Sequence, residues 1–250
     1  MMLDNKIIAI GGITGGIGSS LARRLSEQGY KVFGFARDTE RIASLESELG
    51  TEISSVDATK PDAVADYLKS IYKAEGKVDA YVHAIGSIFI KPAHLTSPED
   101  WRQVLEANLF SAFFALRAYT QIAQKQGHGN CLFFSTAAAQ VGIANHEAIA
   151  AAKGGIEAMV RSAAATYSSR GLRFNAVAPS LTNTPLAKPI IGSEQALEIS
   201  KRMHPLGEIA DAGDVAGLAA WLISEEAKFV TGQTFVIDGG ISSTIPKPKA

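Results

Sequence analysis

The chain has 250 residues, 46% of them hydrophobic, with a formal net charge of −1, and we expect a single domain over residues 1–250. The charge gives no sign of a nucleic-acid partner, no apolar stretch has the uninterrupted length of a membrane span, and the first residues lack a signal-peptide pattern. Because the one cysteine, Cys131, excludes an internal disulfide and a cysteine-based metal cluster, we expect a cytoplasmic protein without a metal site.

Short apolar runs alternate with longer segments of helical periodicity along the chain. This alternation is typical of a parallel sheet with helices on both faces, and right-handed crossovers make such a sheet doubly wound. We therefore predict an α/β fold, a three-layer sandwich around a sheet of about seven strands. The predicted strands are residues 6–10, 31–35, 52–56, 79–84, 130–135, 173–178 and 234–237. The predicted helices lie near residues 16–28, 41–49, 61–75, 98–125, 147–169 and 213–224.

The first strand ends in a glycine-rich turn that opens directly onto a helix, and residues 7–18 read IIAIGGITGGIG. Glycine admits positive φ and lets a ligand approach the backbone without a Cβ in the way. The first helical turn then offers unpaired N–H groups and a positive dipole end to a phosphate. Because the motif stands in the required strand–turn–helix context, it predicts a pyrophosphate site and hence a dinucleotide ligand.

The end of the second strand bears on which dinucleotide is bound. An acid at this point binds the 2′-hydroxyl of NAD, whereas an arginine pairs with the 2′-phosphate of NADP. Ala36 stands where the NAD-selecting acid is expected, and Arg37 follows it. The sequence therefore predicts NADP(H) as the preferred cofactor, with NAD(H) as the alternative. The next residue, Asp38, has a structural role open to it as the cap of the following helix.

Residues 179–205 have the weakest regular pattern in the chain. Long irregular segments in compact domains are often lids, so we predict a flap over a ligand site here. The last residues, 245–250, are expected to fray.

Further landmarks follow the strands in a fixed order. Asp57-Ala58 comes after the third strand and His83-Ala84-Ile85-Gly86 after the fourth; Asn108 follows in the long helix, Ser135-Thr136 after the fifth strand, Lys153 in the next helix, and PSLTNT at residues 179–184 after the sixth. This order and spacing resemble the short-chain dehydrogenase/reductase family, especially its classical 3-oxoacyl-acyl-carrier-protein reductase-like members. The resemblance covers essentially the whole chain.

The resemblance implies a Rossmann-type subunit that binds NAD(P)(H) and acts on a small-molecule substrate. It implies that the pyrophosphate lies among Gly12, Thr14, Gly16, Ile17 and Gly18 and that the adenosine end lies at Arg37, Asp57 and Ala58. Ala84 and Gly86 would then line the middle of the cofactor, and Lys153 would bind the nicotinamide ribose. The carboxamide and phosphate side would be held by Pro179, Thr182 and Thr184. Asn108 would support a water-linked proton relay to Lys153. Family members pair two long helices across a dimer axis, so we expect a homodimer or homotetramer.

The chain departs from the family pattern at the acid/base position. The family places a tyrosine four residues before the lysine, and Ile149 occupies that position, so the usual proton donor is missing. The family serine, thirteen residues earlier still, is Thr136, with Ser135 beside it. Both hydroxyls are candidates to polarise a substrate oxygen. His83 replaces a common asparagine and is interpreted as a packing substitution.

Three interpretations of this departure stay open. His146, seven residues before Lys153, lies close to two helical turns away and offers an imidazole as the proton donor. Alternatively, water protonates the product while Ser135 and Thr136 stabilise the oxyanion. In the third, the chain binds NADP(H) without turnover, as a sensor or as the partner subunit of an active enzyme. We favour reduction of a carbonyl or of an enoyl thioester.

Overall fold

A computed structural model describes residues 6–245, and one seven-stranded sheet runs through them. The strands are β1 Ile7–Gly11, β2 Lys31–Ala36, β3 Ile53–Ser55, β4 Ala80–His83, β5 Gly129–Phe134, β6 Leu172–Pro179 and β9 Thr234–Ile237. Their spatial order is β3-β2-β1-β4-β5-β6-β9, with every neighbouring pair parallel. The order reverses between β1 and β4, which confirms the predicted doubly wound fold.

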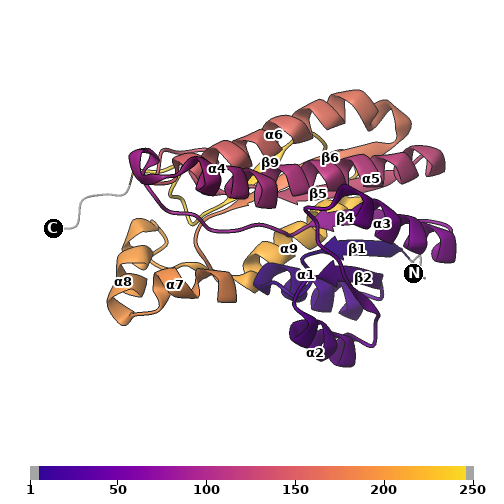
Figure 1. Ribbon diagram of the computed structural model, residues 1–250, viewed down its shortest axis with the longest axis horizontal. Helices are drawn as coiled ribbons and strands as arrows, with labels where there is room; N and C mark the ends of the chain where they lie inside the picture. The colour runs from indigo at the N-terminus through magenta and orange to yellow at the C-terminus, as the bar shows by residue number, and fades with distance from the viewer. Residues whose placement is uncertain (1–5, 246–250) are drawn as a thin grey trace.

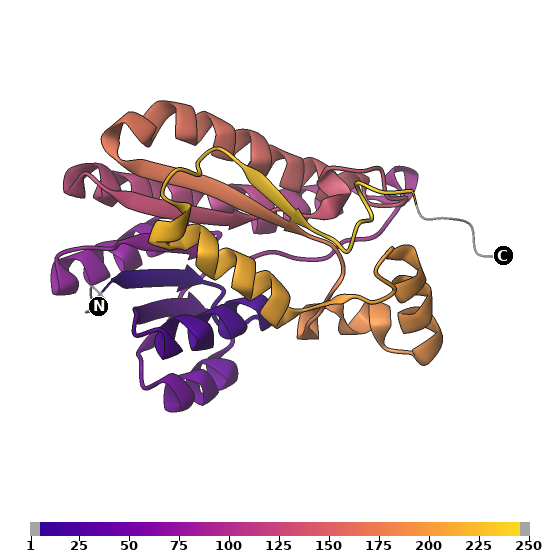
Figure 2. The same cartoon turned by 180° about the vertical axis from the view of Figure 1, so that it is seen from behind.

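Helices cover both faces of the sheet (Figure 1 and Figure 2). One face carries α1 Gly16–Glu27, α2 Thr39–Leu49 and α9 Ala212–Ile223, and the other carries α3 Pro61–Glu75, α4 Pro98–Leu105, α5 Ser111–Gln126 and α6 Glu147–Tyr167. Alternate residues of a strand point to opposite faces. In β1, Ile8 and Ile10 accordingly join the core under α1 and α9, whereas Ile7 and Ala9 join the core under α3 and α5. A strand buried on both faces reads as the continuous apolar run seen in the sequence.

The segment predicted as one helix over residues 98–125 is interrupted. Between α4 and α5 lies a π-helical turn, η2, over Glu106–Phe110. Asn108 lies in this turn with its side chain fully buried, and its amide donates to the Val104 carbonyl. Ser111 likewise donates to the Ala107 carbonyl. Side chains that bond to the backbone of their own helix in this way favour a local change of helical pitch.

Residues 179–205 are more regular than predicted. They contain β7 Thr182–Asn183, which pairs with β8 Ala210–Asp211, then α7 Lys188–Ile191 and α8 Glu194–Met203. The prediction of an irregular segment was therefore wrong over α7 and α8. The Ser193 hydroxyl caps α8 by accepting from the Ala196 N–H, a start signal that the sequence reading overlooked. Figure 2 shows α7 and α8 beyond the carboxyl ends of the strands, where ligands of such sheets bind.

Two smaller expectations concern chain positions. Asp38 caps α2, since its carboxylate accepts from the Arg41 N–H at 3.1 Å. Of the tail predicted to fray, residues 246–250 lie outside the described part of the chain. Among residues 6–245, none of the helices is both long and apolar enough to cross a bilayer.

Candidate active site

The glycine-rich turn leads from β1 into α1 and packs too closely for larger residues. Gly12 has a φ of 79°, and a Cβ there would lie 2.6 Å from the Ala84 carbonyl oxygen. A Cβ on Gly16 would lie 2.7 Å from the Thr184 side chain, and one on Gly18 would overlap the Gly12 carbonyl. Helix α1 begins at Gly16 with no side-chain cap and no acidic residue in its first turn. The N–H groups at the start of its first turn can therefore bond to a diphosphate, and the turn fits the predicted dinucleotide.

The segment that follows β6 passes over this turn. Pro179 ends β6, the Thr182 hydroxyl donates to the Ser180 carbonyl at 3.0 Å, and the Thr184 hydroxyl donates to the Thr182 carbonyl at 3.4 Å. These bonds fold the segment back on itself and bring Thr184 against Gly16. The structure therefore brings the ends of the first and sixth strands together at the glycine turn.

The adenosine end is defined by the tips of β2 and β3. Arg37 is exposed directly after β2. The Asp57 carboxylate accepts from the Thr59 N–H at 3.0 Å and from the Thr59 hydroxyl at 2.9 Å. The Thr59 N–H is the main cause that holds the pKa of Asp57 below its usual range, with a smaller contribution from the charge of Arg37. Ala58 is buried beside it. Arg37 and Asp57 thus share one corner of the site.

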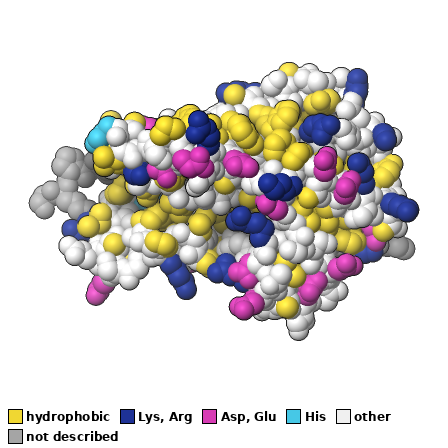
Figure 3. All heavy atoms as spheres, viewed as in Figure 1, with side chains coloured by type: hydrophobic (Ala, Val, Ile, Leu, Met, Phe, Trp, Pro, Cys, Tyr) yellow, Lys and Arg dark blue, Asp and Glu magenta, His cyan; other side chains and the backbone are white. Residues whose placement is uncertain are grey.

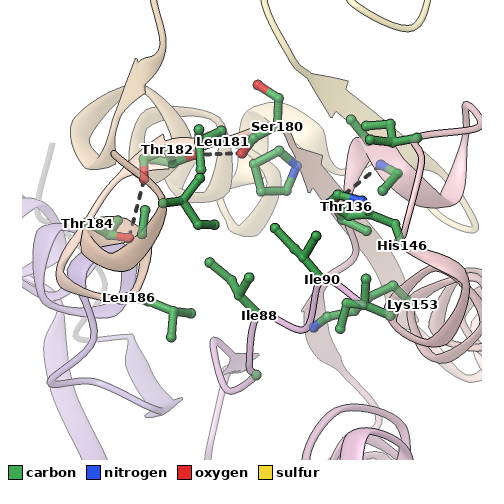
Figure 4. Close-up of a pocket in the computed structure, with 18 of the residues that line it drawn as sticks. Ile88, Ile90, Thr136, His146, Lys153, Ser180, Leu181, Thr182, Thr184 and Leu186 are labelled. Carbon is green, nitrogen blue, oxygen red and sulfur yellow. Dashed lines mark hydrogen bonds between the residues drawn. The ribbon is translucent and has the colours of Figure 1, made fainter. Parts of the chain in front are cut away.

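A cavity of about 510 Å³ continues from the glycine turn to the substrate side. Its walls come from the segments after β4, β5 and β6 and from the facing sides of α6 and α8. Figure 4 shows Thr136, His146 and Lys153 along one side, Thr182, Thr184 and Leu186 across from them, and Ile88 and Ile90 between. The lining is mainly apolar, with Ile143, Ile149, Leu181, Ile190, Ile199 and Met203 also in it. Such a cavity suits a substrate with an apolar body and few polar groups.

Lys153 is buried in the wall of this cavity. Its Nζ donates to the Phe134 carbonyl at 2.9 Å, and burial lowers its pKa to about 8. A Cβ on Gly86 would lie 3.0 Å from this Nζ and 2.9 Å from the Asn108 Oδ1, so only glycine lets the three groups meet. Asn108 in turn accepts from the Ser87 N–H and donates to the Ser87 hydroxyl. Asn108, Gly86 and Lys153 therefore form one packed unit.

The two neighbouring hydroxyls after β5 differ in what they can offer a ligand. Thr136 Oγ1 accepts from the Ala138 N–H at 3.3 Å, which leaves the hydroxyl hydrogen for a substrate oxygen. Ser135 instead donates to the Glu157 carboxylate at 2.6 Å. Because its one hydrogen is used there, Ser135 joins the end of β5 to Glu157 of α6, and Thr136 is the one of the two hydroxyls that keeps a hydrogen for a substrate.

His146 and Ile149 both line the cavity at the start of α6. The His146 Nδ1 lies 2.8 Å from the Ala144 carbonyl, and a carbonyl only accepts, so Nδ1 carries a hydrogen. Asn145, just before it, has a φ of 65°, the left-handed region that asparagine tolerates better than most residues. Ile149 is 6% exposed and packs with Val104 and Ala152, so an apolar wall stands at the family's tyrosine position.

The structure explains His83 and reveals two contacts that the sequence reasoning missed. His83 is buried between the Tyr81 hydroxyl at 2.9 Å and the Ser111 hydroxyl at 3.1 Å. Burial, aided by the charge of Lys153, lowers its pKa to about 3, which agrees with a neutral packing role. The missed contacts pair Ser135 with Glu157 and Ser180 with His204, over 22 and 24 residues of chain. No short-range spacing signals either pair.

Comparisons with known proteins agree with this geometry. A family model described as enoyl-(acyl carrier protein) reductase matches residues 12–242. A probable 2,4-dienoyl-CoA reductase [(2E)-enoyl-CoA-producing] of Bacillus subtilis is 31% identical over 95% of this chain and 97% of its own length. A 3-oxoacyl-[acyl-carrier-protein] reductase of Escherichia coli is 28% identical, over 96% and 99%. A short-chain type dehydrogenase/reductase from Mycobacterium ulcerans superposes with a TM-score of 0.92 at 25% identity, covering 97% of this chain and 91% of that one.

The match of sequence over nearly the whole chain and the match of fold point the same way. The fold brings the glycine turn, the buried Lys153 and Asn108, and the segment after β6 together at one end of the sheet. The chain belongs to the short-chain dehydrogenase/reductase family of NAD(P)-dependent oxidoreductases.

Proposed function

We propose that this protein is an NADPH-dependent reductase of a carbonyl or a conjugated thioester, with His146 as its proton donor. The observation that carries the proposal is that Thr136, His146 and Lys153 line one cavity that runs on to the glycine turn. The mainly apolar lining agrees with an acyl-type substrate. Two relatives named as reductases of thioester-linked acyl groups support the same class.

When bound, NADPH supplies the hydride. The Lys153 ammonium holds the ribose, since it is the buried cation of the site and its pKa of about 8 keeps it mostly charged at neutral pH. The Thr136 hydroxyl donates to the substrate oxygen and stabilises the negative charge that develops there. Protonated His146 gives its Nε2 hydrogen to the reduced substrate, while Nδ1 stays bonded to Ala144. Hydride and proton together convert C=O to CH–OH, or C=C to CH–CH.

The role of His146 is tested by steady-state kinetics of the His146→Ala variant. We expect kcat to fall by about a hundredfold, as for loss of a general acid. Because the variant lacks the proposed proton donor, its pH profile should differ from that of the wild type. The exposed His94 serves as control, and His94→Ala should leave kcat unchanged. An unchanged kcat and pH profile in His146→Ala would remove the histidine from the mechanism.

The position of Ile149 favours one competing function, a cofactor-binding protein without turnover. An apolar side chain stands where the family has a phenol, and it is buried in the cavity wall. The variant Ile149→Tyr separates the two functions. In a reductase whose proton donor limits the rate, a phenol four residues before Lys153 raises ketone turnover. NADPH binding by the wild-type chain, with no oxidation on a panel of ketones and enoyl thioesters even after this change, would favour the sensor or partner subunit.

The proposed preference for NADP(H) rests on Arg37, which is exposed directly after β2. The residue before it is Ala36 and not the acid that would bind the 2′-hydroxyl of NAD. An arginine–phosphate pair is lost in Arg37→Ala, so we expect the Kd for NADPH to rise about tenfold and the Kd for NADH to stay within about twofold. Nucleotide fluorescence titration measures both. Arg102→Ala, on exposed α4, is the matched control. Equal losses for the two nucleotides would show that Arg37 does not read the 2′-phosphate.

A further inference from the structure

A serine–histidine pair forms part of the cavity wall beyond β6. The Ser180 hydroxyl lies 2.9 Å from His204 Nε2, and His204 Nδ1 lies 2.8 Å from the Ser200 carbonyl oxygen. His204 is only 4% exposed, and both Ser180 and His204 line the cavity. The pair joins the start of the segment after β6 to the end of α8. Neither residue has a part in the proton transfer described above.

The Ser200 carbonyl fixes the hydrogens of this pair. A carbonyl oxygen only accepts, so His204 Nδ1 carries a hydrogen, and in neutral imidazole Nε2 is then an acceptor. Ser180 must give its one hydroxyl hydrogen to Nε2. What Ser180 has left for the cavity is its oxygen lone pairs alone. Thr136 has the opposite character, because it accepts from the Ala138 N–H and keeps a hydrogen to donate. Among the hydroxyls that line the cavity, Thr136 thus keeps a hydrogen to donate and Ser180 keeps lone pairs to accept.

The Asp238 carboxylate lies close enough to His204 for the two charges to interact. That carboxylate accepts from the N–H groups of Gly240 at 2.9 Å and Ser242 at 2.8 Å, and both ring nitrogens of His204 have other partners. The two groups that His204 bonds to, a carbonyl and a hydroxyl, are uncharged. The hydrogens described above are those of the neutral ring.

We propose that Ser180, oriented by His204, accepts a hydrogen bond from the substrate and so selects carbonyl compounds that also carry a hydrogen-bond donor, a hydroxyl or an amide N–H. This inference rests on the proposed reductase function, with the carbonyl oxygen at Thr136 and the donor at Ser180. Sites built to bond a substrate hydroxyl reject the analogue that lacks it, since the partner is left unmatched in a buried place. Ser180 is thus a specificity residue, and His204 is its positioning residue.

The test compares medium-chain ketones that carry a hydroxyl one to three carbons from the carbonyl with their O-methyl ethers, assayed at about pH 8. The methyl ether keeps the oxygen but has no hydrogen to donate. We expect the wild-type kcat/KM to favour at least one alcohol by about tenfold or more over its ether. In Ser180→Ala the ratio should fall to about one, since alanine accepts nothing. The ratio should also fall in His204→Phe, because phenylalanine accepts no hydrogen bond from Ser180. The Ser180 hydroxyl can then either donate or accept, so it no longer discriminates between the alcohol and the ether.

The matched control is Ser200→Ala. It removes a cavity-lining hydroxyl that bonds within its own helix, to the Ala196 carbonyl, and it keeps the backbone carbonyl that holds His204. Its alcohol-to-ether ratio should equal that of the wild type. A wild-type ratio near one for the whole series, or a ratio that survives in Ser180→Ala, would overturn the proposal. A preference for the ethers would show that His204 is charged and Ser180 donates, which also overturns it.

A binding measurement separates this inference from the proposed function. If neither ketones nor enoyl thioesters are reduced, the reductase proposal fails, and the selectivity is judged by calorimetry with saturated diols and their monomethyl ethers. Tighter binding of the diol to the wild type, lost in Ser180→Ala and kept in Ser200→Ala, upholds the acceptor role. Equal affinity of diol and ether refutes it.

Discussion

The charged side chain of Lys153 is buried in the wall of the cavity, and its hydrogen-bond partner there is a carbonyl and not a carboxylate. Burial lowers its pKa from 10.5 to about 8, which corresponds to roughly 3 kcal/mol of cost for keeping the side chain charged in the folded state. The same ammonium is the group that would meet the nicotinamide ribose. A residue that destabilises the fold in order to bind a ligand should therefore be replaceable with a gain in stability and a loss of function.

We predict that Lys153→Met raises the free energy of unfolding at pH 7 by about 1–3 kcal/mol and weakens NADPH binding at least tenfold. The folded pKa lies below the unfolded one, so the wild type binds fewer protons when folded between pH 8 and 10.5. Wild-type stability should therefore rise with pH through this window, and the advantage of the methionine should shrink. Urea unfolding at pH 7 and pH 10 measures both. Lys73→Met, at an exposed site on α3, should show neither change. A lysine-to-methionine variant that is less stable at pH 7 would contradict the buried-charge argument.

The sequence predicts some contacts of the site residues and not others. Gly12, Gly16 and Gly18 could be predicted because the turn is local and only glycine fits its contacts. The partners of Ser135 and Ser180 could not be, because Glu157 and His204 come from later helices that the fold brings back. A hydroxyl's role depends on which acceptor takes its hydrogen, and the sequence does not contain that choice.

At the scale of elements, the seven strands of the sheet were predicted because each is an apolar run between helical patterns. The interruption of the helix at residues 106–110 was not, since its apolar spacing continues through the π-helical turn. The turn places Asn108 where its amide holds both the N–H and the hydroxyl of Ser87. Through this contact the π-helical turn positions the loop after β4, which forms one wall of the cavity. π-Helical turns are frequent at functional sites.

We predict that Asn108→Ala loosens the loop after β4 and lowers stability by about 2 kcal/mol, because Ser87 and the Val104 carbonyl lose buried partners. Hydrogen exchange should speed up in residues 86–90, with little change in β2 or in α2, which packs on the other face of the sheet. Gln103→Ala, one turn earlier on the exposed side of α4, is the control. Unchanged exchange in residues 86–90 would mean that the loop is held without Asn108.

At the scale of the molecule, one exposed surface is unusually apolar for a monomer. Phe110 is 47% exposed and Phe113 is 51% exposed, and both line a shallow hollow with Leu109, Phe114 and Met159. Figure 3 shows hydrophobic side chains gathered over α5 and α6 in this region. Exposed patches of this kind mark interaction sites. They support the proposal that two copies of the chain associate through α5 and α6, as the resemblance to family members implied.

We predict that the wild type is a dimer or tetramer at micromolar concentration and that Phe113→Asp shifts it towards the monomer. Aromatic anchors at the centre of an interface typically contribute about 2 kcal/mol or more, so the dissociation constant should rise at least thirtyfold. Sedimentation velocity over a dilution series measures it. Leu95→Asp is the matched control, since Leu95 is 58% exposed and lies outside this surface, so a general effect of an added charge would appear there too. A wild type that sediments as a monomer, or a Phe113→Asp variant with unchanged association, would show that the patch serves something other than self-association.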